Sequence, residues 1–170
     1  MKKTICIIFV SVFLSLFSVN STFANNESES TQKGVIEVET DDEEMNQAIR
    51  NARASIDEFF RALEDPAAEV ESFGMKVLIV NPQTNEGEHI WLSDIKKVDN
   101  QIEGSIANQP AYVTHLSLGQ RYRFDVVDVS DWAYTKDGQM KGNFTMCAQF
   151  KYMQSEEVEY YQQNYGIECN

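Results

Sequence analysis

The sequence has few of the residues that define several common protein classes. Its 170 residues include only 8 glycines, 3 prolines and 3 cysteines, which excludes collagen, low-complexity polymers and disulfide-dense miniproteins. Basic side chains are also scarce, with 14 lysines and arginines against 27 aspartates and glutamates and a net charge of -13. Because nucleic acids and anionic membranes are bound through clustered lysine and arginine, the sequence predicts neither kind of partner. The length predicts one globular domain.

The N-terminus has the three-part pattern of a secretory signal peptide. Lys2 and Lys3 precede an apolar run over residues 5–19, and Thr22 and Ala24 supply the small side chains of a cleavage site. The run has about 15 residues, whereas a membrane-spanning helix needs about 20. We therefore expect cleavage after Ala24, export to the periplasm or beyond the cell, and a mature chain that does not associate with membranes.

Four segments follow from composition and periodicity. They are a signal peptide (1–24), a disordered acidic leader (25–42), an α+β domain (43–153) and a C-terminal helix with a tail (154–170). The leader is predicted to be disordered because its few apolar residues bury too little surface to offset the entropy of ordering. The alternative for its apolar residues Val35, Ile36 and Val38 is an edge strand.

The clearest periodic signal predicts a helix at the start of the domain. Apolar residues recur there at steps of three and four, which places them on one side of a helix. Pro66 is expected to end this helix. The stripe consists of Met45, Ala48, Ile49, Ala52, Ile56, Phe59, Phe60 and Leu63.

After Pro66 the period changes to two, which predicts strands. The expected strands are residues 70–80, 88–95, 101–107, 121–129, 132–135 and 140–148. Asp137-Gly138 is a strong hairpin signal between the last two, and Ser155 is expected to cap a short helix that ends at Gly166. The predicted fold is α+β: an N-terminal amphipathic helix packed on a twisted, mostly antiparallel sheet of about five or six strands, with a short C-terminal helix.

Two cysteines remain after signal cleavage, Cys147 and Cys169. In an oxidising compartment they are disulfide candidates, and the bridge would close a loop of about 23 residues and stabilise the fold by about 3 kcal/mol. The alternative is two unrelated thiols, one in a strand and one in the tail.

The residue types of several catalytic sites are present without the spacing that such sites need. A hydrolase would have to combine His89 with Ser130 and Asp131, but no nucleophile elbow surrounds the serine. His89 and His115 lack the spacing of metal ligands, and no glycine-rich loop precedes a helix to hold phosphate. The sequence predicts no catalytic residues, metal or cofactor.

An aromatic and polar set is the best candidate for a surface that contacts a ligand or partner. Tryptophan and tyrosine combine a large contact area with a polar group, as binding faces require. The alternative is that at least one tryptophan fills the core, because only alternate strand positions face outward. The candidates are Glu88, His89, Trp91, Asp131, Trp132 and Tyr134.

Several short segments resemble a known family when their order is considered together. They are Glu88-His89-Ile90-Trp91-Leu92, then Gly104, Asn108 and Pro110, then Ser130-Asp131-Trp132, Asp137-Gly138 and Gly142-Asn143-Phe144-Thr145. This pattern resembles the YegJ-like family of bacterial proteins, a domain of unknown function numbered 2314, over residues 45–147. The resemblance implies a small α+β domain, often exported, and implies no reaction. The leader and the tail after Ala148, with Cys169, depart from the family core.

These features predict an exported, non-enzymatic binding or interaction module for an unknown protein or small ligand. One alternative is a periplasmic inhibitor or immunity-type protein, whose negative charge would cover a basic partner. Another is a periplasmic hydrolase that uses His89, Ser130 and Asp131. Oligomeric state stays open.

Overall fold

A computed structural model of the chain describes residues 6–9, 35–38, 42–65 and 69–169. The helices are α1 (Glu43–Ala54), α2 (Ile56–Glu64), α3 (Phe144–Gln149) and α4 (Ser155–Tyr165), with short 3-10 turns at Val126–Asp128 and Phe150–Tyr152. The strands are β1 (Cys6–Phe9), β2 (Val35–Val38), β3 (Val70–Val80), β4 (Gly87–Val98), β5 (Gln101–Ile106), β6 (Arg121–Phe124), β7 (Val129–Lys136) and β8 (Gln139–Gly142).

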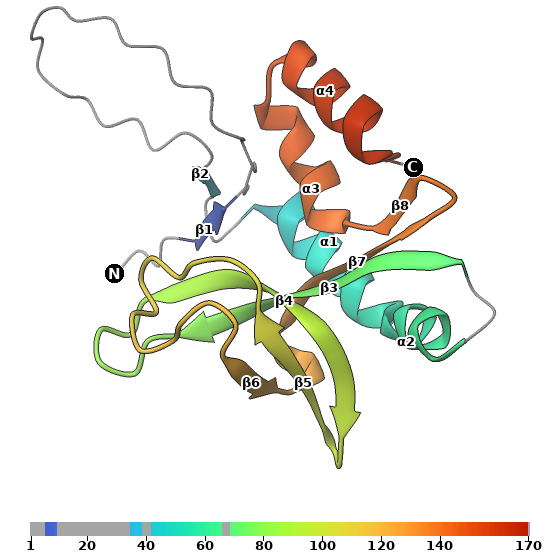
Figure 1. Cartoon of the computed structure of the whole chain (residues 1–170). Helices are drawn as coiled ribbons and strands as arrows, with labels where there is room; N and C mark the ends of the chain where they lie inside the picture. Colours follow the sequence, from blue (N-terminus) through green and yellow to red (C-terminus); the bar gives the residue numbers. More distant parts are fainter. Residues whose placement is uncertain (1–5, 10–34, 39–41, 66–68, 170) are drawn as a thin grey trace, which may run out of the picture.

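The strands form one sheet in the order β2-β1-β4-β3-β7-β8. In addition, β5 pairs with the C-terminal part of β4, and β6 pairs with β5. All pairings from β3 to β8 are antiparallel, and β1 pairs parallel to β4. Figure 1 shows α3 and α4 together at one end of the molecule, with α2 at a different end of the sheet. The fold class is therefore α+β.

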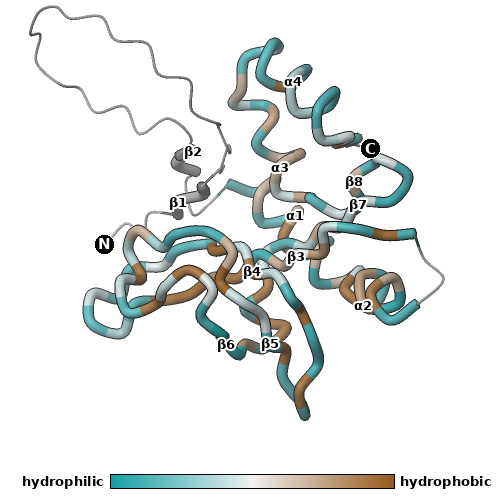
Figure 2. The backbone as a smooth tube through the Cα atoms, in the orientation of Figure 1, coloured by the Kyte–Doolittle hydropathy of each residue, from teal (hydrophilic) through white to brown (hydrophobic). Residues whose placement is uncertain are grey.

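The amphipathic stripe forms two helices that meet at Ser55. Asp42 caps α1 by accepting a hydrogen bond of 2.9 Å from the backbone N–H of Met45. The Ser55 hydroxyl donates to the carbonyl of Asn51 at 2.7 Å, a local bond that competes with the helical backbone pattern. The buried stripe nevertheless continues from Ala52 in α1 to Phe59 in α2, and Figure 2 shows the apolar residues that α2 contributes. Pro66, which was expected to end the helix, lies outside the described residues.

The core lies on one face of the sheet and is centred on Trp132. Its indole N–H donates to the carbonyl of Ala52 at 2.9 Å, which attaches α1 to β7. The ring lies 6.0 Å from Phe59 and 5.4 Å from Phe144, between ring centroids. Gly142 allows this packing, because a Cβ there would lie 2.2 Å from the Trp132 carbonyl oxygen.

The last hairpin agrees with its sequence signal, but the segment after it does not. Asp137 and Gly138 both have positive φ, as the tight turn between β7 and β8 requires. The predicted strand over residues 140–148 is wrong: β8 ends at Gly142, and α3 follows. The reason is Asp131, whose carboxylate accepts hydrogen bonds from the first N–H groups of α3 and so supports the start of a helix. The strand predicted over residues 121–129 is also interrupted, by the 3-10 turn before β7.

The structure joins Cys147 of α3 to Cys169 in a disulfide. This bond, together with a backbone hydrogen bond of 2.9 Å from the N–H of Met140 to the carbonyl of Gly166, fixes the segment after α4. The C-terminal helix and its following segment are thus attached to both α3 and β8.

Parts of the two predicted N-terminal segments fall on described residues. Within the predicted signal peptide, Cys6–Phe9 form β1, and within the predicted leader, Val35–Val38 form β2, the alternative kept open for those residues. The remainder of both segments lies outside the described residues. Among the helices that the structure describes, none has the length and hydropathy needed to cross a membrane.

Candidate functional site

A cavity of about 330 Å³ lies between the sheet face opposite the core and the C-terminal helices. Ligand sites in proteins typically have volumes of about 300–1,000 Å³. The sheet contributes Gly74, Lys76, Trp91 and Ala133 to its lining, and the loop after β5 contributes Asn108. The other side is formed by Met140, Met146, Gln149, Tyr161, Tyr165 and Ile167.

A bulge in β7 decides which side chains reach this face. Lys76 of β3 is opposite Asp131, and the next residue of β3 is opposite Val129, so Ser130 has no opposing residue. The extra residue lets Val129 and Trp132 face the core while Asp131 lies beside Lys76. The bulge therefore places two residues of opposite charge, Lys76 and Asp131, next to each other on neighbouring strands.

Lys76, Asp131 and Thr145 form a buried polar network. The Lys76 ammonium donates to the Thr145 hydroxyl at 2.6 Å, and that hydroxyl donates to the Asp131 carboxylate. Asp131 also accepts N–H bonds from Trp132, Phe144 and Thr145 at 2.8–3.0 Å. Burial raises the pKa of Asp131, while the Lys76 charge and the surrounding donors act in the opposite direction. The network links β3, β7 and α3.

The cavity wall combines this cation with aromatic surface. The Lys76 ammonium lies 5.0 Å from the centroid of the Trp91 ring, within the range of a cation–π interaction. Trp91 is half-buried, in contrast to Trp132, which is 1% exposed. Trp91 is therefore the tryptophan that a molecule in the cavity would contact.

Two buried amide groups at the cavity have hydrogen atoms without an acceptor. The Asn108 side chain accepts a hydrogen bond of 2.7 Å from the backbone N–H of Trp91, which fixes its oxygen and leaves its amide nitrogen as the remaining donor. Among the described residues, neither the Asn108 Nδ2 nor the Gln149 Nε2 has a hydrogen-bond partner. Asn108 is 7% exposed and Gln149 is 1% exposed. An unsatisfied buried donor costs about 1–3 kcal/mol, so an acceptor that comes within hydrogen-bond distance of either nitrogen would stabilise it.

Glu88 has a structural role in the same region. Its buried carboxylate accepts hydrogen bonds of 2.9–3.1 Å from the backbone N–H groups of Ala111, Tyr112 and Val113. These bonds fold the loop that follows Asn108. Glu88 thus supports the cavity indirectly, by fixing the loop that carries one of its unpartnered amides.

His89 and Ser130 lie within hydrogen-bond distance, at 2.8 Å between Nδ1 and Oγ, but their orientation is unlike that of a catalytic pair. The Ser130 hydroxyl donates to the backbone carbonyl of Lys76 at 3.1 Å, so the imidazole is the donor in its bond to Ser130. Burial, with the charges of Lys76 and Arg53, lowers the pKa of His89 to about 3. A general base would instead accept the serine proton and titrate near the working pH.

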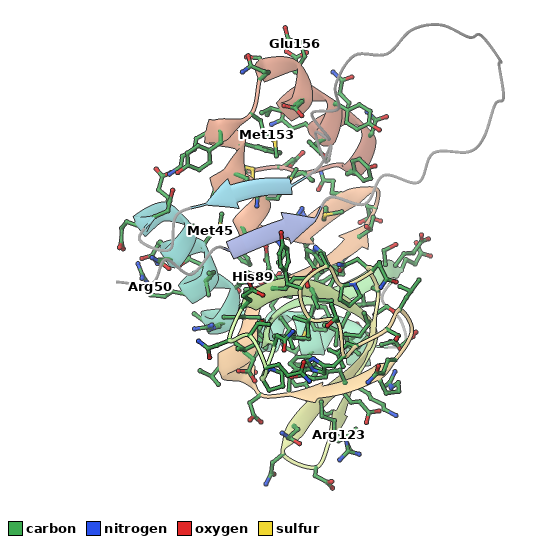
Figure 3. The ribbon with its side chains drawn as sticks, turned by 90° about the vertical axis from the view of Figure 1, so that its left-hand side faces the viewer. Met45, Arg50, His89, Arg123, Met153 and Glu156 are labelled. Atoms are coloured by element: carbon green, nitrogen blue, oxygen red, sulfur yellow. A yellow bond between two sulfur atoms is a disulfide. The ribbon has the colours of Figure 1, made fainter. Side chains whose placement is uncertain are left out.

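Asp131 does not complete a triad with this pair. Its hydrogen bonds go to Trp132 and to the first residues of α3. His89, Ser130 and Asp131 are all absent from the lining of the cavity. Figure 3 shows His89 beside β1, and Ile8 of β1 lies opposite it in the parallel ladder. The geometry therefore does not favour the hydrolase alternative.

Only one of the six surface candidates lies at the cavity. Trp91 lines it, whereas Trp132 and Tyr134 are buried in the core and Glu88, His89 and Asp131 are buried in polar contacts. These five side chains do not form an exposed surface, because each lies in the core or makes a buried hydrogen bond. The described residues contain no group of three or more histidine, cysteine, aspartate or glutamate side chains that could hold a metal.

Sequence reasoning missed Lys76, Asn108 and Gln149. Lys76 had a detectable signal, since it is the one charged residue within the apolar run of residues 75–80. Asn108 was named among the residues that resemble the family, and it directly follows the strand predicted over residues 101–107. Gln149 had no signal, because its segment was expected to follow a strand rather than to belong to a helix.

Comparison with known proteins identifies two relatives. The chain is 32% identical over 108 residues to "Uncharacterized protein YegJ" of Escherichia coli (strain K12), which covers 62% of this chain and 67% of that protein. It is 29% identical over 137 residues to "Putative ankyrin repeat protein NMB1133/NMB1171" of Neisseria meningitidis serogroup B (strain ATCC BAA-335 / MC58), covering 77% of this chain and 54% of that protein. The chain thus spans about half the length of the second relative. No solved structure matches the chain.

The family match confirms the resemblance found in the sequence and lengthens it. It begins at the cap of α1 and includes α4 and Cys169, which the sequence-based resemblance had left outside the family core. The chain belongs to the family described as "Uncharacterized protein conserved in bacteria (DUF2314)", whose model matches residues 42–169.

Proposed function

We propose that this protein is an exported, non-enzymatic binding module that holds a small molecule between its sheet and its C-terminal helices. The observation that carries the proposal is the cavity lined by Trp91, Met146 and Tyr161, with two buried amide donors that lack an acceptor. Apolar walls with a few convergent polar groups are typical of small-molecule sites. The signal-peptide pattern of residues 1–24 supports export.

The orientation of His89 and Ser130 supports binding rather than turnover. A serine whose proton is donated to a carbonyl, next to an imidazole that is itself the donor, lacks an activated nucleophile. On this proposal, the protein binds its ligand and releases it chemically unchanged.

The test is a fragment screen monitored by the two indole N–H resonances of the protein. Trp91 lines the cavity and Trp132 is buried in the core, so binding in the cavity shifts the Trp91 resonance in a saturable manner and leaves that of Trp132 nearly unchanged. Ala107→Leu should weaken binding by filling part of the cavity. Ala111→Leu is the matched control, since Ala111 is an exposed alanine of the same loop that does not line the cavity. A screen in which no fragment shifts Trp91 contradicts the proposal.

Export is tested separately by cell fractionation. The proposal expects the chain outside the cytoplasm with Asn25 as its N-terminal residue, because the predicted cleavage follows Ala24. Recovery of the intact N-terminus in the cytoplasm would remove export from the proposal and leave the binding function standing.

A further inference from the structure

Two buried side-chain amides at the cavity share one property: in each, the atom without a partner is a hydrogen-bond donor. The amide nitrogens of Asn108 and Gln149 have no acceptor among the described residues. Lys76 lines the same cavity and brings a positive charge to it. A ligand that completes this site must therefore supply acceptor atoms.

The charge of the cavity lining is opposite to that of the whole chain. The sequence has a net charge of -13, yet Lys76 is the only charged side chain among the described residues that line the cavity. Asp131 balances Lys76 from within the sheet, but it is fully buried and does not line the cavity. An anionic ligand would thus meet a cation and two amide donors without facing a carboxylate.

The rest of the lining fits an apolar body. The lining includes Trp91, Met146, Tyr161 and Ile167. These side chains offer aromatic and aliphatic surface and carry no charge. One end of the ligand therefore carries the polar group, and the remainder is hydrophobic.

On these observations, and resting on the proposed function, we infer that the cavity binds a small carboxylate with an apolar body, whose carboxylate oxygens accept hydrogen bonds from Asn108 and Gln149 beside the Lys76 ammonium. The two amides recognise the carboxylate as a planar acceptor. Lys76 compensates its charge. The cost of leaving the amides unsatisfied is removed when the ligand is bound.

The test compares hydrocinnamate with hydrocinnamyl alcohol, which have the same apolar body and differ in the terminal group. Binding is followed by titration of the Trp91 indole resonance at about pH 7. Hydrogen bonds to a charged group are stronger than those to a neutral one, so hydrocinnamate should bind roughly tenfold or more tightly. Equal affinity of the two probes, or tighter binding of the alcohol, overturns the carboxylate inference while the proposed function stands.

Gln149→Glu separates recognition from packing, because it keeps the shape of the side chain and replaces an amide donor with a carboxylate oxygen. We expect hydrocinnamate affinity to fall by roughly tenfold or more, with the alcohol affected less. Gln109→Glu is the matched control: it adds the same charge to an exposed residue next to Asn108 and should leave the preference unchanged. Should Gln149→Glu fail to fold, Asn108→Asp tests the second donor, because one oxygen still accepts from the Trp91 N–H.

The outcomes distinguish the two levels of the proposal. A cavity that takes neither hydrocinnamate nor the alcohol, and no fragment of the screen, contradicts both the ligand class and the binding function. Retention of the carboxylate preference in Gln149→Glu and Asn108→Asp contradicts the ligand class alone.

Discussion

At the scale of single residues, a buried charged side chain connects several elements at the sheet face opposite the core. Asp131 is completely buried. Its carboxylate accepts hydrogen bonds from the backbone N–H and the hydroxyl of Thr145 at the start of α3, and its negative charge compensates the positive charge of Lys76. A residue that serves two strands and a helix at once is expected to be sensitive to small chemical changes.

Asp131→Asn tests this role. The amide keeps the shape but removes the negative charge beside Lys76, so we expect the free energy of unfolding to fall by about 3 kcal/mol, as when one partner of a buried pair is lost. Urea unfolding measures the change. Asp137→Asn, at an exposed turn position that tolerates asparagine, should change stability by less than about 0.5 kcal/mol. Similar effects of the two substitutions would contradict the role of Asp131.

The pKa of His89 predicts the effect of acid on stability. Burial lowers it from 6.5 to about 3, so between these values the unfolded chain binds a proton that the folded chain does not. Stability is then lost as the pH falls from 6.5 towards 3, by up to about 1.4 kcal/mol per pH unit. Urea unfolding at several pH values should give a flatter dependence for His89→Asn. His115→Asn, at an exposed position, should keep the original slope, and an unchanged slope in His89→Asn would contradict the buried neutral imidazole.

The candidate site was only partly predictable at this scale. The aromatic signal led to Trp91, but it led equally to Trp132, because the sequence does not tell which face of β7 meets the core once a bulge changes its register. Glu88 and Asp131 were expected at a surface since charged side chains are usually solvated. They are buried because backbone N–H groups of distant segments satisfy them.

At the scale of elements, local sequence signals succeeded where the partners are close in the chain. The bounds of β3 agree with the strand predicted over residues 70–80, and Gly166 is the C-cap of α4 as predicted, but the N-cap of α4 is Gln154 and not Ser155. α3 was missed because the carboxylate that supports its first turn belongs to β7, 13 residues before Phe144. A cap supplied from another element leaves no local pattern.

The join between β8 and α3 should tolerate no side chain at Gly142. A Cβ there would lie 2.2 Å from the Trp132 carbonyl oxygen, and φ is +78°. We expect Gly142→Ala to destabilise the fold by about 3 kcal/mol or more, because both overpacking and a left-handed backbone are imposed. Gly119→Ala is the control, with the same φ and no atom within 4 Å, and should cost only about 1–2 kcal/mol. Equal losses in urea unfolding would show that the contact with Trp132 is unimportant.

The disulfide fixes one wall of the cavity. Cys169 is bound to Cys147 across a separation of 22 residues, and the enclosed segment carries Tyr161, Tyr165 and Ile167. Reduction should lower the free energy of unfolding by about 3 kcal/mol, the value typical of a loop of this size, and weaken hydrocinnamate binding. The double variant Cys147→Ser with Cys169→Ser should have the free energy of unfolding and the hydrocinnamate affinity of the reduced protein, and reductant should change neither value. Full ligand affinity in that variant would contradict the role of the disulfide in the cavity wall.

At the scale of the whole molecule, the predicted signal peptide and the folded domain overlap at β1. In the sheet, β1 pairs with the start of β4, where Ile7 and Ile8 lie opposite Glu88 and His89. Cleavage after Ala24 would remove this strand. The hydrophobic core that the structure describes is formed by residues between Ala52 and Phe144.

The chain that begins at Asn25 should therefore fold without β1. We expect cooperative urea unfolding and two well-resolved indole resonances, because the contacts of Trp132 with Ala52, Phe59 and Phe144 are all retained. Consecutive N–H groups of a strand point to opposite neighbours, so one of the Glu88 and His89 amides loses its partner strand and should exchange fast relative to that of Met75, because β3 stays between β4 and β7. Non-cooperative unfolding of this chain would mean that β1 belongs to the mature fold, and the expectation of cleavage after Ala24 would then fail together with it.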